Sequence, residues 1–351
     1  MPFRETLLTL FPALTRIPPH SYVVGGAIRD LLHGREPADV DVACLDPLAA
    51  AQCVRPRVIR LGDEEHLSAY RVVKDDRVYD FAALLHDNID SDLARRDFTI
   101  NAMAVDLDRD VLLDPHGGQR DLSAGVVRMV DPKNFDDDPL RLLKAVRMAI
   151  RFGFTIDDAT REAIRTRAQR ILEVAPERVT YELAIIFGAH AFRRAVHLLH
   201  ETALDAPLDF ATRELSADNV TLAGAYALLV RDPKAYAARW RWSDPLLHEV
   251  QTLQRLVEHH DRLALFDAGD SIARQLVPVL RALGRNDALD RPDFSIRALL
   301  TGRDIAERTG LPPGKELGRI KRALLEAQVR GDVSTTEQAI AFIKNASTRE
   351  P

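Results

Sequence analysis

Hydrophobic positions follow two different spacings along the chain, and the change comes near residue 132. Before this point apolar residues form short runs separated by polar or glycine-containing turns, a pattern typical of β-strands. We predict strands at 22–24, around Asp39, and at 57–61, 67–73, 77–83 and 103–107, with a helix at 27–33. The first region is therefore predicted to mix strands and helices.

Beyond residue 132, apolar residues recur every three or four positions, which is the spacing of amphipathic helices. Pro139 suits a first helical position, so Asp138 is the expected N-cap of the first long helix. Strand-like runs are hard to find here, and the region is predicted to be all-helical. We predict helices at 139–152, 157–172, 176–189, 191–204, 219–231, 245–264, 271–283, 295–308, 315–330 and 335–346.

Two acidic residues stand in the strand that follows the first strand and helix. Side chains at positions i and i+2 of a strand point to the same face. Asp39 and Asp41 are therefore expected to present two carboxylates side by side, with Val40 and Val42 facing the core. Two close negative charges are costly unless a cation lies between them, and Mg²⁺ prefers oxygen ligands.

The glycines before the first helix add a second element to this chemistry. Gly25 and Gly26 allow the backbone to approach a ligand, and the helix start exposes N–H groups to an anion. Arg29 could add a charge-assisted contact to a phosphate. Singly, these features have plainer explanations: a turn, a solvated strand edge for the acids, and a surface Arg29–Asp30 pair. In this order they favour metal-assisted nucleotidyl transfer.

Composition limits the class of protein. A length of 351 residues predicts two to three domains, and a net charge of −5 with a pI near 6.1 gives no global basic field. Any polyanion site must then be a local patch. Two cysteines, Cys44 and Cys53, suit a reducing cytoplasm, and the first residues predict a short amphipathic helix, not a signal peptide. No apolar run approaches the ~20 residues that span a bilayer.

Further candidate residues lie in the first region and near the C-terminus. Asp80 could complete a metal triad with Asp39 and Asp41, although a strand-end aspartate is an equally good explanation. Arg95 and Arg96 offer planar donors suited to phosphate or ribose. The glycine turn at 114–122 is predicted to be a loop, and the sequence at 258–261 is predicted to be an exposed helix end.

Several short motifs occur in one order along residues 20 to 190. Together they resemble the class II tRNA nucleotidyltransferases and bacterial poly(A) polymerases of the DNA polymerase beta superfamily. The motifs are Gly25-Gly26-Ala-Ile-Arg29-Asp30, Asp39-Val-Asp41, Arg95-Arg96-Asp97-Phe98-Thr99-Ile-Asn101-Ala102, Asp114-Pro-His-Gly117-Gly118, Asp137-Asp138-Pro-Leu-Arg141 and Glu177-Arg178-Val-Thr-Tyr-Glu182-Leu183.

This resemblance implies an α+β fold of defined organisation. A small nucleotidyltransferase head with a mixed sheet would occupy residues 1–131. A helical neck with nucleotide-base recognition would follow at 132–200, and a helical body and tail that hold tRNA would occupy 201–351. The protein is then expected in the cytoplasm, with tRNA and CTP as its partners, and with ATP as a further partner in the alternatives that add A.

The resemblance also implies roles for single residues. Asp39 and Asp41 would hold two Mg²⁺ ions that activate the RNA 3′-hydroxyl and neutralise the triphosphate. Asp138 and Arg141, on one helix face, would choose the base, and Glu177 and Arg178 would brace the neck. Residues expected to contact the triphosphate or ribose are Gly25, Gly26, Arg29, Arg95, Arg96, Asp97 and Asn101. Basic residues expected to contact the tRNA backbone are Lys315, Lys321 and Arg322.

Two departures from the family pattern matter. His66 stands where the family often has a glutamate, so the third metal carboxylate stays open between Asp80 and Glu65. The segment AALLHDNIDS at 82–91 is short and lacks Arg and Lys, whereas complete CCA-adding members have a longer, basic, flexible loop there. We therefore predict addition of CC. The alternatives are CCA or A addition, poly(A) polymerase, and a non-catalytic RNA-binding relative.

Overall fold

The computed structural model describes residues 3–61 and 69–347, which form two compact units. The first unit runs to residue 189 and includes 194–208, and the second comprises 190–193 and the residues from 209 onward. Within the described ranges, no helix combines the length and the apolar character that crossing a membrane requires. The predicted head, neck and body boundaries at 131 and 200 are not tested by this division and stay a prediction.

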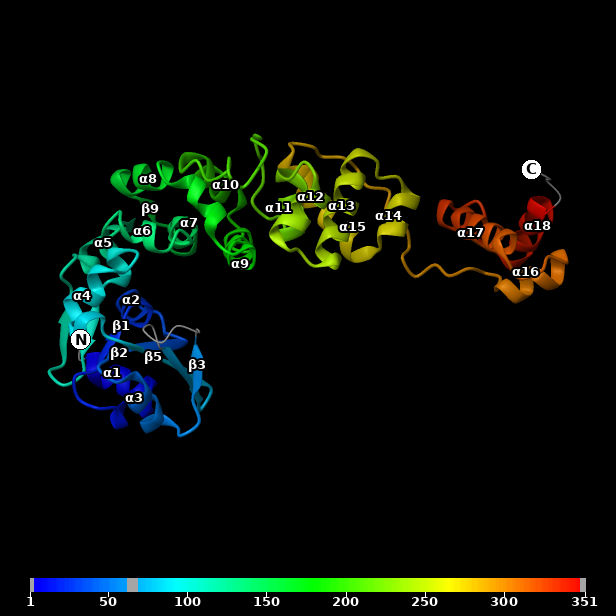
Figure 1. The fold of residues 1–351 in the computed structure, drawn as a ribbon. Helices are drawn as coiled ribbons and strands as arrows, with labels where there is room; N and C mark the ends of the chain where they lie inside the picture. The colour runs from blue at the N-terminus through cyan, green and yellow to red at the C-terminus, as the bar shows by residue number, and fades with distance from the viewer. Residues whose placement is uncertain (1–2, 62–68, 348–351) are drawn as a thin grey trace. The chain divides into compact units, whose positions relative to one another are not determined.

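A seven-stranded mixed sheet forms the centre of the first unit, with the order β3-β4-β5-β2-β1-β6-β7 (Figure 1). Its one parallel pair is β2 with β5, and the other neighbours are antiparallel. This agrees with the predicted mixed sheet. The strands are β1 Tyr22–Val24, β2 Asp39–Cys44, β3 Ile59–Leu61, β4 Ala69–Lys74, β5 Arg77–Ala83, β6 Ala104–Asp106 and β7 Val111–Leu113.

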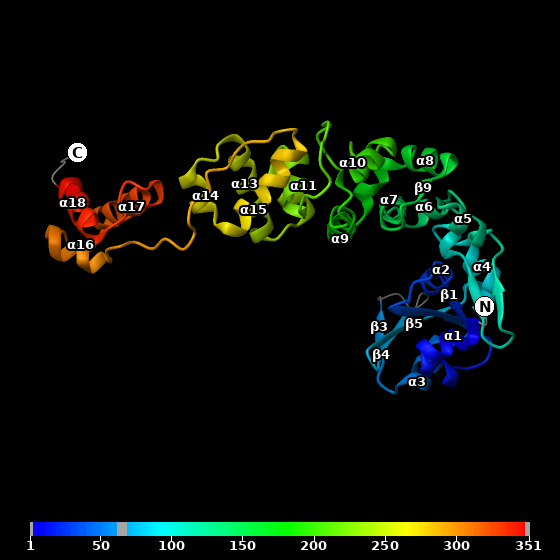
Figure 2. The same cartoon turned by 180° about the vertical axis from the view of Figure 1, so that it is seen from behind.

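Apolar residues of neighbouring helices cover one face of this sheet, and the acidic residues of β2 lie on the other face. Val40 and Val42 are 1% exposed in a core shared with α1 (Phe3–Leu10) and α3 (Pro47–Val54). Figures 1 and 2 show these helices beside the sheet from opposite sides. Alternation along β2 therefore places its acidic residues on the opposite face. The short helix α2 (Gly26–Leu32) follows β1 directly.

Several short elements of the first unit escaped the sequence prediction. The segment at 114–122, predicted as a loop, contains the start of α5 (Gly118–Ala124), and Asp114 accepts hydrogen bonds from the Gly118 and Gln119 amides. The helices α3 and α4 (Ile89–Ala94) begin at Asp46 and Asn88, whose side chains cap them. These helices have too few residues to show a periodic pattern, so their caps are the better signal.

Helices and one two-stranded sheet complete the first unit. The helix predicted from Pro139 begins instead at Arg141, because Pro139 and Leu140 form a turn. The predicted 157–172 helix is divided, since a 3₁₀ segment follows its first part. The elements are α6 Asn134–Asp137, α7 Arg141–Phe152, α8 Asp158–Arg165, η5 Ala168–Glu173, α9 Pro176–Phe187 and α10 Phe192–Glu201, with β8 Val126–Val127 and β9 Thr155–Ile156.

The second unit is helical in the residues that the structure describes, as predicted, but three of its helices differ from the prediction. The helix at Pro233–Trp240, which Asp232 caps, was not predicted. The 245–264 helix is broken, because Asp261 caps a new helix. The 295–308 helix starts only at Gly302, where Thr301 and Asp304 form a capping box. The helices are α11 Leu222–Leu229, α12 Pro233–Trp240, α13 Asp244–Glu258, α14 Arg262–Ala268, α15 Asp270–Ala282, α16 Gly302–Thr309, α17 Lys315–Arg330 and α18 Thr336–Ser347.

Candidate active site

The two acids of β2 lie as the strand period predicted. Asp39 and Asp41 are both exposed on one face, while Val40 and Val42 between and after them are buried. Pairing with β1 places Asp41 opposite Val24, the last residue before the glycine bend. Pairing with β5 places Asp80 opposite Asp41 on the other side. Three carboxylate-bearing positions are thus gathered on neighbouring strands.

The Asp41 carboxyl group has an unusually high pKa. The residue reaches solvent, but surrounding protein atoms remove part of the hydration of its carboxyl group, and this burial raises its pKa from 3.8 to about 6. The negative charges of Asp39 and Asp80 raise the pKa further, while Arg96 opposes them. The surroundings of the Asp41 carboxyl group therefore supply too little positive charge to offset its burial.

Gly25 lets the chain pass very close to this carboxylate. Its φ of +73° is a conformation that side chains disfavour. A Cβ at this position would also lie 3.6 Å from the Asp41 Oδ2 and 2.6 Å from the Arg96 Nη1. The glycine bend thus brings together residues of β1, β2 and the segment before η4 (Thr99–Asn101).

Asp80 is already engaged by a cation of the neighbouring strand. The Arg71 Nε and Nη2 donate to its two carboxylate oxygens at 2.8 and 2.6 Å. Over residues 3–61 and 69–347, no three acidic, histidine or cysteine side chains form a group that could hold a metal ion. Glu65 and His66 lie outside the described residues. The third metal ligand therefore stays a prediction.

Arg95 and Arg96 line a cavity of about 230 Å³ together with Asp92, Asp97, Arg141 and Lys144. Both guanidinium groups are held from behind by Asp92, which is 1% exposed. Arg95 donates to the Asp92 Oδ1 at 2.6 Å and Arg96 to the Oδ2 at 3.1 Å. No role was predicted for Asp92, although its i+3 and i+4 spacing to the two arginines could have indicated one.

Arg29 does not lie where the sequence predicted a phosphate contact. Its guanidinium is buried and donates to Asp30 at 2.8 Å and to the Asn101 Oδ1 at 2.6 Å. Asn101 in turn donates to the Asp97 Oδ1 at 2.9 Å. Helix α7 closes over the arginine, with the Phe152 ring centre 4.8 Å away. This arginine therefore supports Asn101 and Asp97 and has no free face for a triphosphate.

Asp138 and Arg141 do not share a helix face, because Asp138 precedes α7. Its carboxylate lies 3.2 Å from the Arg178 guanidinium and 3.8 Å from the Lys144 amine. Arg141 donates to the backbone carbonyls of Arg95 and Asn134 at 2.8 and 3.0 Å. Arg141 lines the arginine cavity, and Asp138 contacts Lys144, another residue of its lining.

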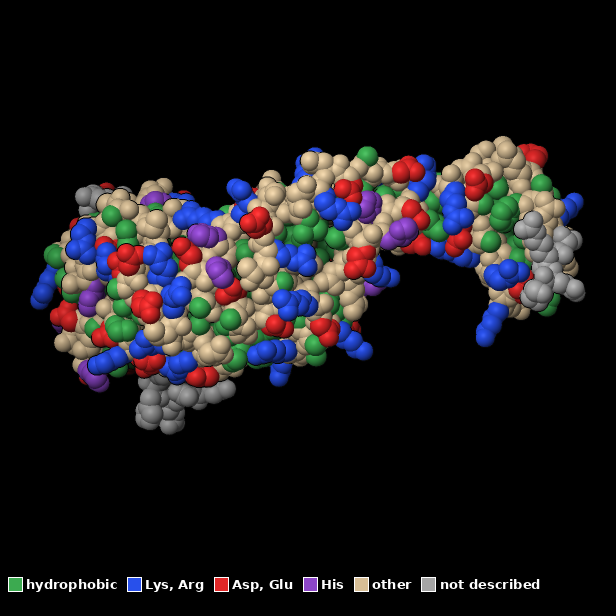
Figure 3. Space-filling view, turned by 90° about the horizontal axis from the view of Figure 1, so that it is seen from above, with side chains coloured by type: hydrophobic (Ala, Val, Ile, Leu, Met, Phe, Trp, Pro, Cys, Tyr) green, Lys and Arg blue, Asp and Glu red, His purple; other side chains and the backbone are tan. Residues whose placement is uncertain are grey.

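The basic residues of α17 are only partly available. Arg322 forms ion pairs with Asp267 of α14 and Glu326, but its side chain is 45% exposed, and its predicted RNA contact stays a prediction. Lys315 and Lys321 are exposed. On the face shown in Figure 3, basic and acidic side chains are interspersed. The predicted RNA contacts of the two lysines stay predictions.

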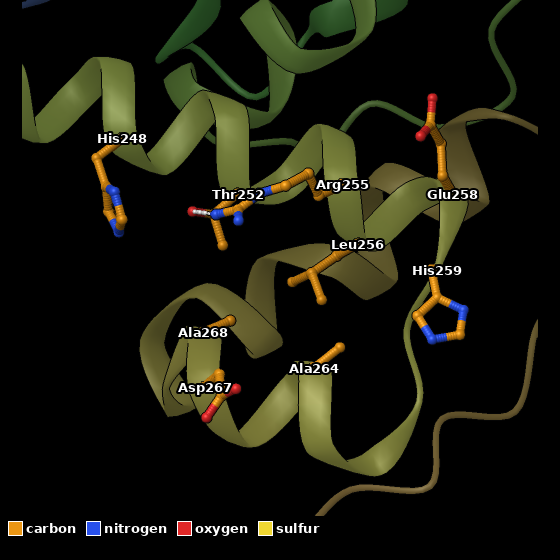
Figure 4. A pocket seen from close by; sticks show the side chains of 9 residues that line it. All are labelled: His248, Thr252, Arg255, Leu256, Glu258, His259, Ala264, Asp267 and Ala268. Carbon is orange, nitrogen blue, oxygen red and sulfur yellow. Dashed lines mark hydrogen bonds between the residues drawn. The ribbon is translucent and has the colours of Figure 1, made fainter. Parts of the chain in front are cut away.

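A larger cavity, about 460 Å³, lies in the second unit between α13 and α14 (Figure 4). Its polar lining mixes signs, with His248, Arg255 and His259 against Glu258 and Asp267. His259 caps the end of α13 and contacts Asp261 at 3.2 Å, which confirms the predicted helix end. Of its charged side chains, Asp267 pairs with Arg322, which is not among the lining residues.

The acid pair of β2 has the properties of a divalent-cation site. It offers only oxygen donors, both open to solvent, and the charge of Asp41 is disfavoured by burial and by the neighbouring acids. A hard cation such as Mg²⁺ relieves that cost, because it supplies the missing positive charge to the carboxylates. The residues present thus fit the predicted Mg²⁺ at Asp39 and Asp41.

Comparison with known families finds two matching models. The "Poly A polymerase head domain" matches the overlapping segments 21–86 and 63–128, which hold the sheet, the acid pair and the arginines. The "Probable RNA and SrmB- binding site of polymerase A" matches residues 153–208.

Curated proteins and solved structures of related sequence match over nearly the whole chain. The A-adding tRNA nucleotidyltransferase of Deinococcus radiodurans is 29% identical over 97% of this chain and 98% of its own length. The CC-adding tRNA nucleotidyltransferase of Thermus thermophilus is 30% identical, over 95% of this chain and 94% of its own. The crystal structure of the Bacillus stearothermophilus CCA-adding enzyme with CTP aligns with a TM-score of 0.76 at 26% identity, covering 98% and 97% of the two chains.

Proposed function

The chain belongs to the tRNA nucleotidyltransferase family, and from this premise we propose that it adds C residues from CTP to tRNAs that lack their 3′ end, without adding the terminal A. Its relatives include A-adding, CC-adding and CCA-adding enzymes, so the proposal rests on the chain itself. In the reaction the RNA 3′-oxygen bonds to the α-phosphorus of the nucleotide, and pyrophosphate leaves.

The connection between β5 and α4 carries the proposed CC specificity. It consists of the five residues 84–88, between Ala83 and Ile89, and contains no Arg or Lys. Its ends are fixed, because the Leu84 amide donates to the Cys44 carbonyl at 3.0 Å and the Asn88 side chain accepts from the Asp90 amide. The family resemblance links addition of the final A to a long, basic, flexible loop here, and this connection leaves no room for one.

Asp39 and Asp41 would hold Mg²⁺, and Asp80 is the candidate for a third carboxylate. When bound, the ion supplies positive charge that favours ionisation of the attacking hydroxyl and stabilises the charge on the triphosphate. The chain's own residues position the substrates around the acids. Gly25 places no side chain beside the Asp41 carboxylate, so that phosphate oxygens can approach it.

Arg95 and Arg96 would bind the triphosphate and ribose in the 230 Å³ cavity, because their guanidinium groups donate several N–H bonds in one plane. Asp97 and Asn101 would contact the ribose. Arg29 holds Asn101 from the protein side, at 2.6 Å, and so fixes which way its amide faces. We therefore assign Arg29 to positioning and not to direct phosphate contact.

Asp138 would accept a hydrogen bond from the exocyclic amine of cytosine, and Arg141 would donate to the ring acceptor beside it. Uracil presents a carbonyl at the amine position, which would leave the carboxylate facing another acceptor. An unpaired buried polar group costs roughly 1–3 kcal/mol. Arg178 and Lys144 hold the Asp138 carboxylate ready for this contact.

The substitution Asp138→Ala is expected to lower the preference for CTP over UTP about tenfold, because the acceptor that distinguishes the two bases is lost. Steady-state kcat/KM for both nucleotides on one tRNA measures the preference. Asp136→Ala is the matched control, since Asp136 lies two residues earlier and pairs only with Arg167 and Arg170 among the described residues. An unchanged preference in Asp138→Ala would contradict this role.

The function is tested by incubating the protein with three tRNAs and with each nucleoside triphosphate separately. The tRNAs end before the first C, after the first C and after the second C of the mature 3′ end. Addition of C to the first two, and of nothing to the third, is expected on a sequencing gel. Efficient addition of A to the third would overturn CC specificity, and long ATP-dependent tails on any RNA would indicate a poly(A) polymerase.

A further inference from the structure

Tyr181 is an aromatic side chain left open to solvent on helix α9. It is 66% exposed, and over residues 3–61 and 69–347 no other aromatic residue falls in the exposed class. A tyrosine ring is rigid and apolar on its faces, and nucleobases stack on such faces with little dependence on sequence.

The rotation of α9 about its axis is fixed by its buried face and by an ion pair to α7. The buried residues include Val179, Leu183 and Ile186. Glu182 lies 3.0 Å from the Arg147 guanidinium of α7. With about 100° of rotation per residue, Tyr181 falls roughly opposite the buried Val179 and about 60° around the helix from Arg178. The ring therefore lies on the exposed edge of α9 that carries Arg178.

This edge of α9 also carries the partner of the base-selecting acid. Arg178 lies one turn before Tyr181 and contacts the Asp138 carboxylate at 3.2 Å. Side chains of a helix lean toward its N-terminus, so the Tyr181 ring leans over the turn that carries Arg178. The aromatic face is thus placed beside the proposed base-selecting site, about one helical turn (~5 Å) further along α9.

An exposed cation lies beside the ring. The side chains of Arg178, Lys144 and Arg147 are 52%, 25% and 22% exposed. Arg178 and Lys144 contact Asp138, and Arg147 contacts Glu182, so nearby acids balance these cations. Arg178 is the most exposed of the three and lies one turn before Tyr181. A cation beside an aromatic ring is a usual element of single-stranded RNA sites.

Resting on the proposed function, we propose that Tyr181 stacks on an unpaired base at the 3′ end of the RNA substrate and holds that end beside the base-selecting site. The base of the incoming nucleotide is less suited to stack on Tyr181, because that base is assigned to Asp138 and the triphosphate to the arginine cavity. The family model for RNA binding covers this helix without assigning any residue.

The test compares Tyr181→Ala with Tyr181→Phe, which keeps the aromatic face. The alanine variant is expected to raise the KM for tRNA about tenfold, with the KM for CTP and the kcat at saturating tRNA unchanged. The phenylalanine variant is expected to behave as the wild type. Val111→Ala is the control, because Val111 is also an exposed apolar residue, 46% exposed on β7.

A binding measurement without catalysis separates this inference from the proposed function. An RNA hairpin with 2-aminopurine as its unpaired 3′ nucleotide is titrated with protein in the absence of nucleotides. The fluorescence is expected to be quenched by the wild type and Tyr181→Phe, and not by Tyr181→Ala. Equal quenching by all three, or a rise in the KM for CTP in place of that for tRNA, would overturn the stacking role. A wild type that quenches but adds no nucleotide would instead refute the proposed function.

Discussion

Replacement of Asp41 by asparagine is expected to slow nucleotide addition by about 10³-fold or more and to make the metal-free protein more stable at neutral pH. The first effect follows because a neutral amide is a poor ligand for Mg²⁺, and the charge stabilisation that the ion supplies is worth several kcal/mol in such reactions. The second follows because burial and the neighbouring acids raise the pKa of Asp41 to about 6, so that its charged form is disfavoured.

The pH dependence of the stability gain has a definite sign. The pKa of Asp41 is about 6 in the folded protein and near 3.8 in the unfolded chain, so the folded protein binds the extra proton between these values. Stability of the wild type therefore falls as pH rises through this window. The advantage of Asp41→Asn should be full above pH 6 and disappear below about pH 4, where the wild-type carboxyl is protonated in both states.

Thermal melting in the absence and presence of Mg²⁺ measures the change in stability and the binding of the ion, both independently of activity. Mg²⁺ alone should raise the melting temperature of the wild type, because it binds only the folded acid pair, and should raise that of Asp41→Asn much less. Asp332→Asn, at an exposed aspartate, is the control and should leave all of these quantities unchanged. Identical melting temperatures of the wild type and Asp41→Asn across the pH range would show that the charged Asp41 carboxylate does not destabilise the folded protein.

The parts of this site that sequence analysis predicted are those set by local periodicity. Asp39 and Asp41 had to share a face once a strand was assigned, because the period of two leaves no alternative. The bounds of α17 and of β5 were likewise predicted from the spacing of their apolar residues. Residues within a few positions of one another thus carried the information.

The parts that sequence analysis missed depend on partners brought close by the fold. Arg29 was expected to contact a phosphate, and only the packing of α7, more than a hundred residues away, shows that it is buried against Phe152 and Asn101. The contact between Asp138 and Arg178 joins residues forty positions apart. A pattern in one segment cannot reveal which side chain of another segment will compensate its charge.

Asp92 is a third case: the sequence predicted roles for Arg95 and Arg96, but not for the carboxylate of Asp92 that both contact. The substitution Asp92→Ala is expected to lower kcat/KM for CTP on the order of 10²-fold, chiefly through KM, because Arg95 and Arg96 lose the carboxylate that aims them into the cavity. Two charge-assisted contacts are lost together. Stability should fall by about 2 kcal/mol, less than for a fully buried pair, since the arginines are 36% and 23% exposed.

A double-mutant cycle distinguishes positioning from a general loss of stability. If Asp92 acts through the two arginines, adding Asp92→Ala to an Arg95→Ala/Arg96→Ala protein should change kcat/KM for CTP by less than about twofold. The control is Asp270→Ala, which removes the common partner of Arg274 and Arg291 in the second unit and should leave the KM for CTP unchanged. A further large loss on adding Asp92→Ala to the double variant would mean that the buried carboxylate supports the cavity by another route than its arginines.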